Sequence, residues 1–250
     1  QCSVRNHTHH EDMCDPNPGD TCPRHREVWH VPTVAALASP LLRCGRTQRE
    51  RDAMSRPTVV PGHVLAQMLT TLLSPNSAAI RQTEEDMRRV LSQPAFICDL
   101  FEQLQSSPSA ELRQLAAVLV RRRVGSMWMK LEPPVRLALQ AAMIAQLTEE
   151  PERLVRRSLT SVVAVVAKSA LPKGEWPELS VFLFEATRSP VAEHRELSMQ
   201  LLATLLESPD VVEHSLRQHF THISSTLLHL LADQSSPHVR RATLKCVGAW

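Results

Sequence analysis

The sequence predicts an all-α fold, a HEAT-like right-handed α-solenoid of about five helical hairpins preceded by a disordered N-terminal segment. The 250 residues include only 6 glycines and no tyrosine, beside abundant Leu, Ala, Arg, Glu and Gln. Such straight-chain residues lose little rotamer freedom in helices. From Val64 onward, long segments of helical periodicity are separated by short turns rich in Pro and Ser. No run alternates with period two between turn residues, so no strand is predicted.

Residues 1–62 form the predicted disordered segment. Prolines recur throughout it, and it has no sustained apolar periodicity. A segment of this kind buries too little apolar surface to offset the entropy lost on ordering. We therefore expect the folded part of the chain to cover residues 63–250.

Helices are expected throughout residues 63–250, and consecutive helices pair as hairpins. The expected helices are 63–73, 76–92, 94–106, 109–126, 132–149, 151–170, 176–188, 190–208, 210–232 and 236–250.

Five turns share one pattern, in which a proline precedes a helix whose first or second turn contains arginine. These prolines are Pro75, Pro108, Pro151, Pro190 and Pro237. Proline is tolerated in a first helical turn because its missing N–H would have no partner there. The separations of 33, 43, 39 and 47 residues favour two-helix HEAT-type repeats over the shorter and more regular tetratricopeptide repeat. One such hairpin cannot bury its apolar faces alone, so we expect neighbouring repeats to stack.

The expected helix 109–126 ends in three consecutive arginines, 121–123. On a helical wheel, two opposite faces emerge: Leu112, Leu115, Ala116 and Leu119 on one, and Arg113, Gln114, Ala117 and Arg121 on the other. Arg122 and Arg123 are placed in the last turn, where cations stabilise the negative end of the helix dipole. We interpret the triplet as repeat arginines with dipole compensation. Binding of nucleic acid is the alternative, but it favours stacking aromatics, and only Trp128 is near.

Polar stripes on the second helices of the hairpins differ in sign. The stripes of 76–92 and 151–170 are rich in arginine, whereas 190–208 carries Glu193, Glu196, Gln200 and Glu207. Stacked side by side, these stripes form one surface that passes from basic to acidic, which favours a partner-binding surface. The net charge is only +2, from 28 basic and 26 acidic residues, so no bulk field attracts polyanions.

Motifs of enzyme chemistry are missing from the sequence. It has no phosphate-binding glycine loop, zinc-protease HExxH or nucleophile-elbow GxSxG. Cys14 and Cys22 stand eight positions apart, unlike the tight pairs of structural zinc sites. No apolar run is long enough to predict a membrane span. We expect no enzyme activity, no cofactor and no metal.

The stretch RQTEEDMRRVLSQPAFICDLFEQLQSSPSAELRQLAAVLVRRRVGSMW, residues 81–128, resembles the N-terminal domain shared by importin-β-type nuclear transport receptors. The matching positions are Thr83, Glu84, Met87, Pro94, Phe96, Arg113, Gln114, Ala116, Ala117, Leu119 and Trp128. Thr83 departs from the usual alanine. The resemblance covers about residues 65–250, with the N-terminal domain at about 76–150.

The resemblance implies a nuclear import receptor that shuttles between cytoplasm and nucleus and passes the pore of the nuclear envelope. Its implied partners are the GTPase Ran in its GTP form, Phe-Gly nucleoporins and basic protein cargo, with no membrane and no direct nucleic acid. Such receptors would start near Met54, so residues 1–53 are expected to be an extension foreign to the family. The chain is expected to be an N-terminal fragment, because these receptors are several times longer.

Candidate Ran contacts follow from the resemblance and the polar stripes together. They are Arg81, Glu85, Arg88, Arg113, Gln114, Arg121, Arg153, Arg156 and Arg157. Helices 176–188 and 210–232 are candidates for an apolar groove for Phe-Gly motifs, although ordinary packing between repeats is the favoured interpretation there. The alternative function is a structural HEAT-repeat scaffold for a multiprotein complex.

Overall fold

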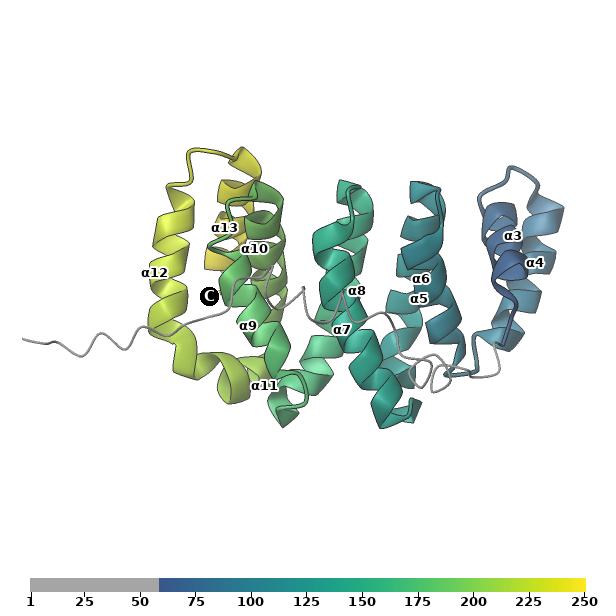
Figure 1. Ribbon diagram of the computed structural model, residues 1–250, viewed down its shortest axis with the longest axis horizontal. Coiled ribbons are helices and arrows are strands. Elements are labelled where there is room, and N and C mark those ends of the chain that lie inside the picture. The colour runs from purple at the N-terminus through teal and green to yellow at the C-terminus, as the bar shows by residue number, and fades with distance from the viewer. Residues whose placement is uncertain (1–58) are drawn as a thin grey trace, which may run out of the picture. The chain divides into compact units, whose positions relative to one another are not determined.

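The computed structural model describes residues 59–250, and every regular element in this range is helical. The helices follow one another as hairpins that stack side by side (Figure 1). This arrangement confirms the predicted all-α solenoid. The zinc alternative at Cys14 and Cys22, the start at Met54 and nearly all of the predicted disordered segment lie outside the described residues.

The first two hairpins have strong local reasons to begin where they do. Their helices are α3 (Gly62–Leu72), α4 (Ser77–Val90), α5 (Phe96–Ser106) and α6 (Ala110–Met127). Asn76 caps α4, because its side-chain oxygen accepts hydrogen bonds from the N–H groups of Ala78 and Ala79 at 3.1 Å. Ser109 caps α6 by accepting from the Leu112 N–H at 3.3 Å. These bonds satisfy N–H groups that have no partner inside the helix.

The later hairpins begin mainly with prolines or after extended residues. Their helices are α7 (Pro133–Glu149), α8 (Arg153–Ala170), α9 (Pro177–Ala186), α10 (Ala192–Leu206), α12 (Phe220–Leu231) and α13 (Pro237–Ala249). Short 3₁₀ turns, η1 (Trp128–Lys130) and η2 (Leu171–Lys173), follow α6 and α8. Gly174 ends η2 with φ of 68°, a left-handed conformation that glycine adopts without steric penalty.

The prediction of one helix over 210–232 is wrong. The segment consists of α11 (Pro209–Val211), the π-helix η3 (Val212–Leu216), the 3₁₀ turn η4 (Arg217–His219) and then α12. Val211 and Leu216 are both buried, although residues five apart on a regular α-helix point about 140° from each other. The wide π turn brings both side chains to the buried face, which explains the change of pitch.

The second helices of the last four hairpins form a row in which α6 contacts α8, α8 contacts α10, and α10 contacts α13. We call these four helices the second-helix row. At Gly125, α6 approaches α8 so closely that an added Cβ would lie 3.3 Å from a methyl carbon of Val165. The core between repeats includes Trp128 and Trp176, each 1% exposed. Burial between stacked hairpins therefore stabilises the array, as predicted.

Two expectations for α6 are wrong. Ala117, which the helical wheel placed on the polar face, is fully buried, because α6 packs against α5 on one side and α8 on another. Arg122 and Arg123 are not in the last turn, since α6 continues to Met127 and its last turn carries no basic residue. Dipole compensation therefore does not explain the arginine triplet.

The folded part also begins before the predicted boundary at residue 62. The backbone N–H groups of Val59 and Val60 donate to the same carboxylate oxygen of Asp99 at 3.1 and 3.2 Å. Burial raises the pKa of Asp99, and these two hydrogen bonds oppose that effect. Val60 itself is only 7% exposed, so this entry to α3 belongs to the core.

Candidate functional site

The candidate residues on α6 and α8 form two groups. One group connects neighbouring repeats, and the other lies on a surface that a binding partner can reach. Arg113 belongs to the first group. It forms a two-point ion pair with Glu150, with Nε–Oε2 at 3.0 Å and Nη2–Oε1 at 2.9 Å. Its other amino group donates to the carbonyls of Ser107 and Pro108. With its side chain 11% exposed, Arg113 has a structural position rather than a place on an open face.

Arg153 also joins repeats, but at the surface. Its Nη2 lies 2.6 Å from Oε1 of Glu196 on α10 and 3.1 Å from Nδ1 of His238 on α13. Gln200 donates to the same Glu196 oxygen at 2.8 Å. One side chain of α8 therefore reaches the second helices of the next two hairpins. The side chain of Arg153 remains 58% exposed, so a partner could still contact it.

Arg156 lies between α8 and the following hairpin, where it lines a groove with residues of α10 and its charge acts on His194. One amino group donates to the carbonyl of Pro151 at 2.9 Å. Its Nε is buried and has no hydrogen-bond partner in the described part of the chain. Arg156 is therefore equivalent to Arg113 in its backbone contact but lacks the carboxylate that Arg113 has.

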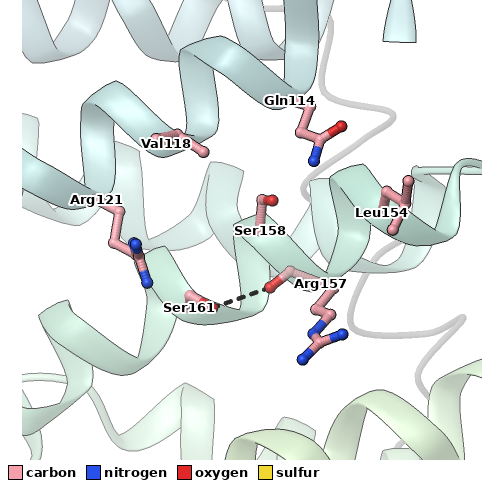
Figure 2. A pocket seen from close by; sticks show the side chains of 7 residues that line it. All are labelled: Gln114, Val118, Arg121, Leu154, Arg157, Ser158 and Ser161. Carbon is pink, nitrogen blue, oxygen red and sulfur yellow. Dashed lines mark hydrogen bonds between the residues drawn. The ribbon is translucent and has the colours of Figure 1, made fainter. Parts of the chain in front are cut away.

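Gln114, Arg121 and Arg157 are the candidates brought together in an open pocket. With Val118 of α6 and Leu154, Ser158 and Ser161 of α8, they line a groove of about 340 Å³ between the two helices. Figure 2 shows these seven side chains, with Ser161 between the two arginines in that view. Within residues 59–250, neither Arg121 nor Arg157 pairs through its guanidinium with another side chain. We call this the α6–α8 groove.

The three candidates on α4 lie apart from this groove. Arg81, Glu85 and Arg88 are all exposed, and α4 packs on α3, which in turn contacts α5 and α6. Only Met87 of α4 is buried. The predicted continuous stripe is therefore interrupted between α4 and α6.

A second groove, of about 640 Å³, extends along α8, α10 and α13. Its α8 side is basic and its α10 part carries Glu193, Glu196 and Glu207, as the sequence indicated. Its α13 side is basic again, through Arg241 and Lys245. This third stripe was not predicted, although positions 238, 241 and 245 have the spacing of one helical face. Val118 and Leu154 were not predicted as site residues either, because they come together only when α6 and α8 lie side by side.

The outer helices that are candidates for binding Phe-Gly motifs, α9 and the segment leading into α12, pack together through contacts between aromatic rings. Phe184 of α9 lies 4.9 Å from the ring of His219 and 5.0 Å from that of His222, between centroids. Arg188 contacts His222 at 3.3 Å. Burial lowers the pKa of His222, and the charges of Arg188 and His219 act in the same direction. These contacts are what ordinary packing between repeats predicts.

Residues 59–250 hold no cluster of His, Cys, Asp and Glu that could bind a metal ion. None of the helices in this range is both long and apolar enough to cross a membrane.

Comparison with known proteins also indicates a protein of stacked helical repeats. Residues 151–250 match the family described as IPO5-like, TPR repeats. This description uses the tetratricopeptide term, the repeat type that the proline spacing disfavours, and both repeat types are stacked helical hairpins. The spacing of the turn prolines here remains longer than a tetratricopeptide repeat.

Individual relatives extend over more of the chain. Importin-4 of Mus musculus is 30% identical over 185 residues, which is 74% of this chain and 17% of that protein. Importin-4 of Homo sapiens is 32% identical over 164 residues, covering 65% of this chain and 15% of the relative. The probable importin subunit beta-4 of Schizosaccharomyces pombe is 28% identical over 148 residues, 59% of this chain and 14% of the relative. The chain therefore spans less than a fifth of the length of these relatives.

Proposed function

Because the chain belongs to the importin-β family of nuclear transport receptors, we propose that it binds Ran in its GTP form and takes part in carrying protein cargo through the nuclear pore. The observation that carries the proposal is the juxtaposition of free arginines on α6 and α8 within the region similar to importin-4. Side chains without internal partners have no ion pair to lose when a protein binds them.

The candidate Ran contacts now have different roles in the proposal. Gln114, Arg121 and Arg157 are proposed as direct contacts, since they line the open α6–α8 groove. Arg81, Glu85 and Arg88 are proposed as a second, separate contact on α4. The remaining candidates, Arg113, Arg153 and Arg156, are proposed to hold the repeats in register for these contacts.

Basic cargo and nucleoporins complete the proposal. The exposed acids Glu193 on α10 and Glu207 directly after it are proposed to attract basic cargo, because opposite charge steers association. Phe-Gly nucleoporins are proposed to contact the outer helices, where Val181 and Leu228 are exposed. Such a receptor shuttles between cytoplasm and nucleus. We propose no enzyme activity for it.

Release of cargo by Ran is proposed to be a coupling free energy between two ligands that favour different arrangements of the same repeats. A joint such as the Arg153 contact to Glu196 and His238 links three hairpins. A ligand that alters one of these repeats would therefore affect the next two.

The test is binding of the full 250-residue chain to Ran loaded with a non-hydrolysable GTP analogue, compared with Ran loaded with GDP. We expect preference for the GTP form and a loss of at least about tenfold in affinity on Arg157→Glu. Arg122→Glu changes the charge equally and lies outside the groove lining, so it serves as the matched control. Equal binding of both Ran forms, or none, would overturn the proposal and favour a structural scaffold.

A further inference from the structure

The α6–α8 groove combines two features, exposed apolar surface and positive charge that forms no ion pair within residues 59–250. Gln114, Val118 and Arg121 recur at the spacing of one face of α6. Leu154, Arg157 and Ser161 recur in the same way on α8. The groove is therefore bounded by one continuous face from each helix.

The charge in the groove is one-sided. Its lining contains two arginines and no acidic residue. The guanidinium groups of Arg121 and Arg157 make no ion pair within the described part of the chain, whereas Arg113 and Arg153 on the same two helices do. A guanidinium presents a fork of donors that matches a carboxylate. The groove is suited to an anion and would repel a basic segment.

The polar groups around the arginines add acceptors and donors. Gln114 and Ser158 form no hydrogen bond through their side chains with any other residue in 59–250. Ser161 donates to the carbonyl of Arg157 at 3.1 Å, as drawn in Figure 2. Its hydroxyl oxygen can still accept a hydrogen bond. A peptide backbone laid along the groove would therefore find partners beside the charges.

The apolar part of the groove indicates a protein ligand. Leu154 is 63% exposed although it belongs to a packed helix, and Val118 of α6 lines the same groove. Apolar surface of this kind is stabilised when a partner's side chain covers it. A simple inorganic anion would leave Leu154 uncovered.

We propose that the α6–α8 groove binds an acidic segment of a protein partner, with a carboxylate between Arg121 and Arg157 and apolar side chains of the same segment against Val118 and Leu154. The inference rests on the proposed function in that three groove residues belong to the surface proposed to contact Ran. It adds the chemistry of the partner at this site. Basic cargo must then bind elsewhere on the array.

Nucleic acid is the competing ligand for the same charges, and the structure disfavours it. Binding of single strands uses aromatic side chains as stacking platforms. The groove lining has none. Trp128, the aromatic residue nearest in sequence to the arginine triplet, is 1% exposed and packed in the core.

The experiment measures fluorescence anisotropy of a labelled peptide, Glu-Leu-Glu-Glu-Leu-Glu, titrated with the full chain. We expect saturable binding with a Kd below about 1 mM. The double variant Arg121→Ala/Arg157→Ala should weaken binding at least about tenfold, and Leu154→Ser at least about threefold. A peptide with Gln in place of Glu should bind as poorly to the wild-type chain as the acidic peptide binds to the double variant.

The matched control is Arg122→Ala/Arg123→Ala, which also removes two positive charges, but from positions on α6 outside the groove lining. It should change the Kd less than about twofold. Circular dichroism should show equal helix content in both doubles, since all four substitutions are of side chains outside the core. Equal loss in the two doubles would overturn the inference, because it would show only bulk electrostatic attraction.

Two further results would also overturn it. One is absence of saturable binding of the acidic peptide to the wild-type chain. The other is tighter binding of a single-stranded oligonucleotide of equal charge, lost in the Arg121→Ala/Arg157→Ala variant and steeply weakened by salt. Ran binding is measured separately. If the peptide binds as expected and Ran-GTP does not, the groove inference stands and the proposed function fails. If Ran-GTP binds and the peptide does not, the proposed function stands and the groove inference fails.

Discussion

Arg113 and Glu150, 37 positions apart, hold α6 to the turn that starts α8 through a two-point ion pair. Glu150 is fully buried at its side chain, and its oxygens also accept from the N–H of Glu152 and the amide of Gln146. The same relationship recurs between Arg195 and Asp233, 38 positions apart, with Nε–Oδ2 at 2.9 Å. Each arginine stands five residues after a turn proline. Charge pairs at equivalent positions thus connect successive repeats.

Removing one member of the first pair should strongly destabilise the array. Arg113→Ala leaves the buried carboxylate of Glu150 without its cation, and we expect a loss of about 3 kcal/mol in the free energy of unfolding. The hydrogen bonds that Arg113 donates to Glu150 also raise the pKa of the Arg113 guanidinium. Urea denaturation followed by circular dichroism measures the loss. Arg122→Ala, at an exposed position on the same helix, should change stability by less than about 0.5 kcal/mol, and a similar loss there would contradict the structural role of Arg113.

The ion pair between Arg195 and Asp233 should make the free energy of unfolding depend on pH in the acid range. Burial of Asp233 acts to raise its pKa, but hydrogen bonds from Ser235, Arg195 and the N–H groups of Ser235 and Ser236 outweigh burial and hold the pKa at about 2. A lowered pKa in the folded state adds stability that is complete above the unfolded value of 3.8 and is lost as the pH falls toward 2.

Asp233→Asn isolates this contribution, because the amide does not titrate. We expect the variant to be less stable than the wild type by about 1 to 2 kcal/mol near pH 6, after screening by solvent. The gap should narrow between pH 4 and pH 2 as the aspartate becomes protonated. Thermal unfolding of both chains across that range measures it, and a gap independent of pH would show that the ionised carboxylate is not what stabilises this joint.

Helix α6 shows most clearly which features of the structure the sequence predicts and which it does not. Turn prolines and helical periodicity predicted its bounds within one or two residues, because caps and apolar spacing are local properties. The wheel failed for Ala117 and Arg113, since it assumes that a helix buries one face, while α6 packs between two neighbours. Which arginines are free could not be predicted either. The answer depends on acids that lie about 40 positions away, in the next repeat.

Glu185 on α9 offers a test in the opposite direction, toward higher stability. Both of its carboxylate oxygens are buried and form no hydrogen bond within residues 59–250, and burial raises its pKa. Ionisation at neutral pH therefore opposes folding. Glu185→Met, similar in length and uncharged, should stabilise the chain by about 1 kcal/mol at pH 7.

The gain from Glu185→Met should shrink near pH 4, where the wild-type carboxyl is protonated and the penalty of ionisation disappears. Glu178→Met, at an exposed position of the same helix, controls for the change of residue type. Differential scanning fluorimetry at both pH values compares the three chains. A gain equal at pH 4 and pH 7 would mean that added packing, not removal of a charge, stabilises the variant.

At the joint between α8 and α10, the arginine equivalent to Arg113 and Arg195 has no carboxylate partner among residues 59–250. Arg156 stands five residues after Pro151, as Arg113 does after Pro108 and Arg195 after Pro190. The turn between α9 and α10 has Ser189 where the preceding turn has Glu150, each directly before the turn proline. Both side chains accept from the N–H two residues on, Ser189 from Val191 at 3.2 Å and Glu150 from Glu152 at 3.0 Å. Only Glu150 reaches an arginine.

Ser189→Glu should therefore complete the series, because its carboxylate could keep the bond to Val191 and reach the unpartnered Nε of Arg156. Burial lowers the pKa of the neighbouring His194, and the charge of Arg156 adds to this, so Arg156 is the cation available at pH 7. We expect stabilisation of about 1 kcal/mol. In a double-mutant cycle with Arg156→Ala, the gain should vanish when the arginine is absent. A gain that persists without Arg156 would mean that Ser189→Glu acts on the start of α10 alone.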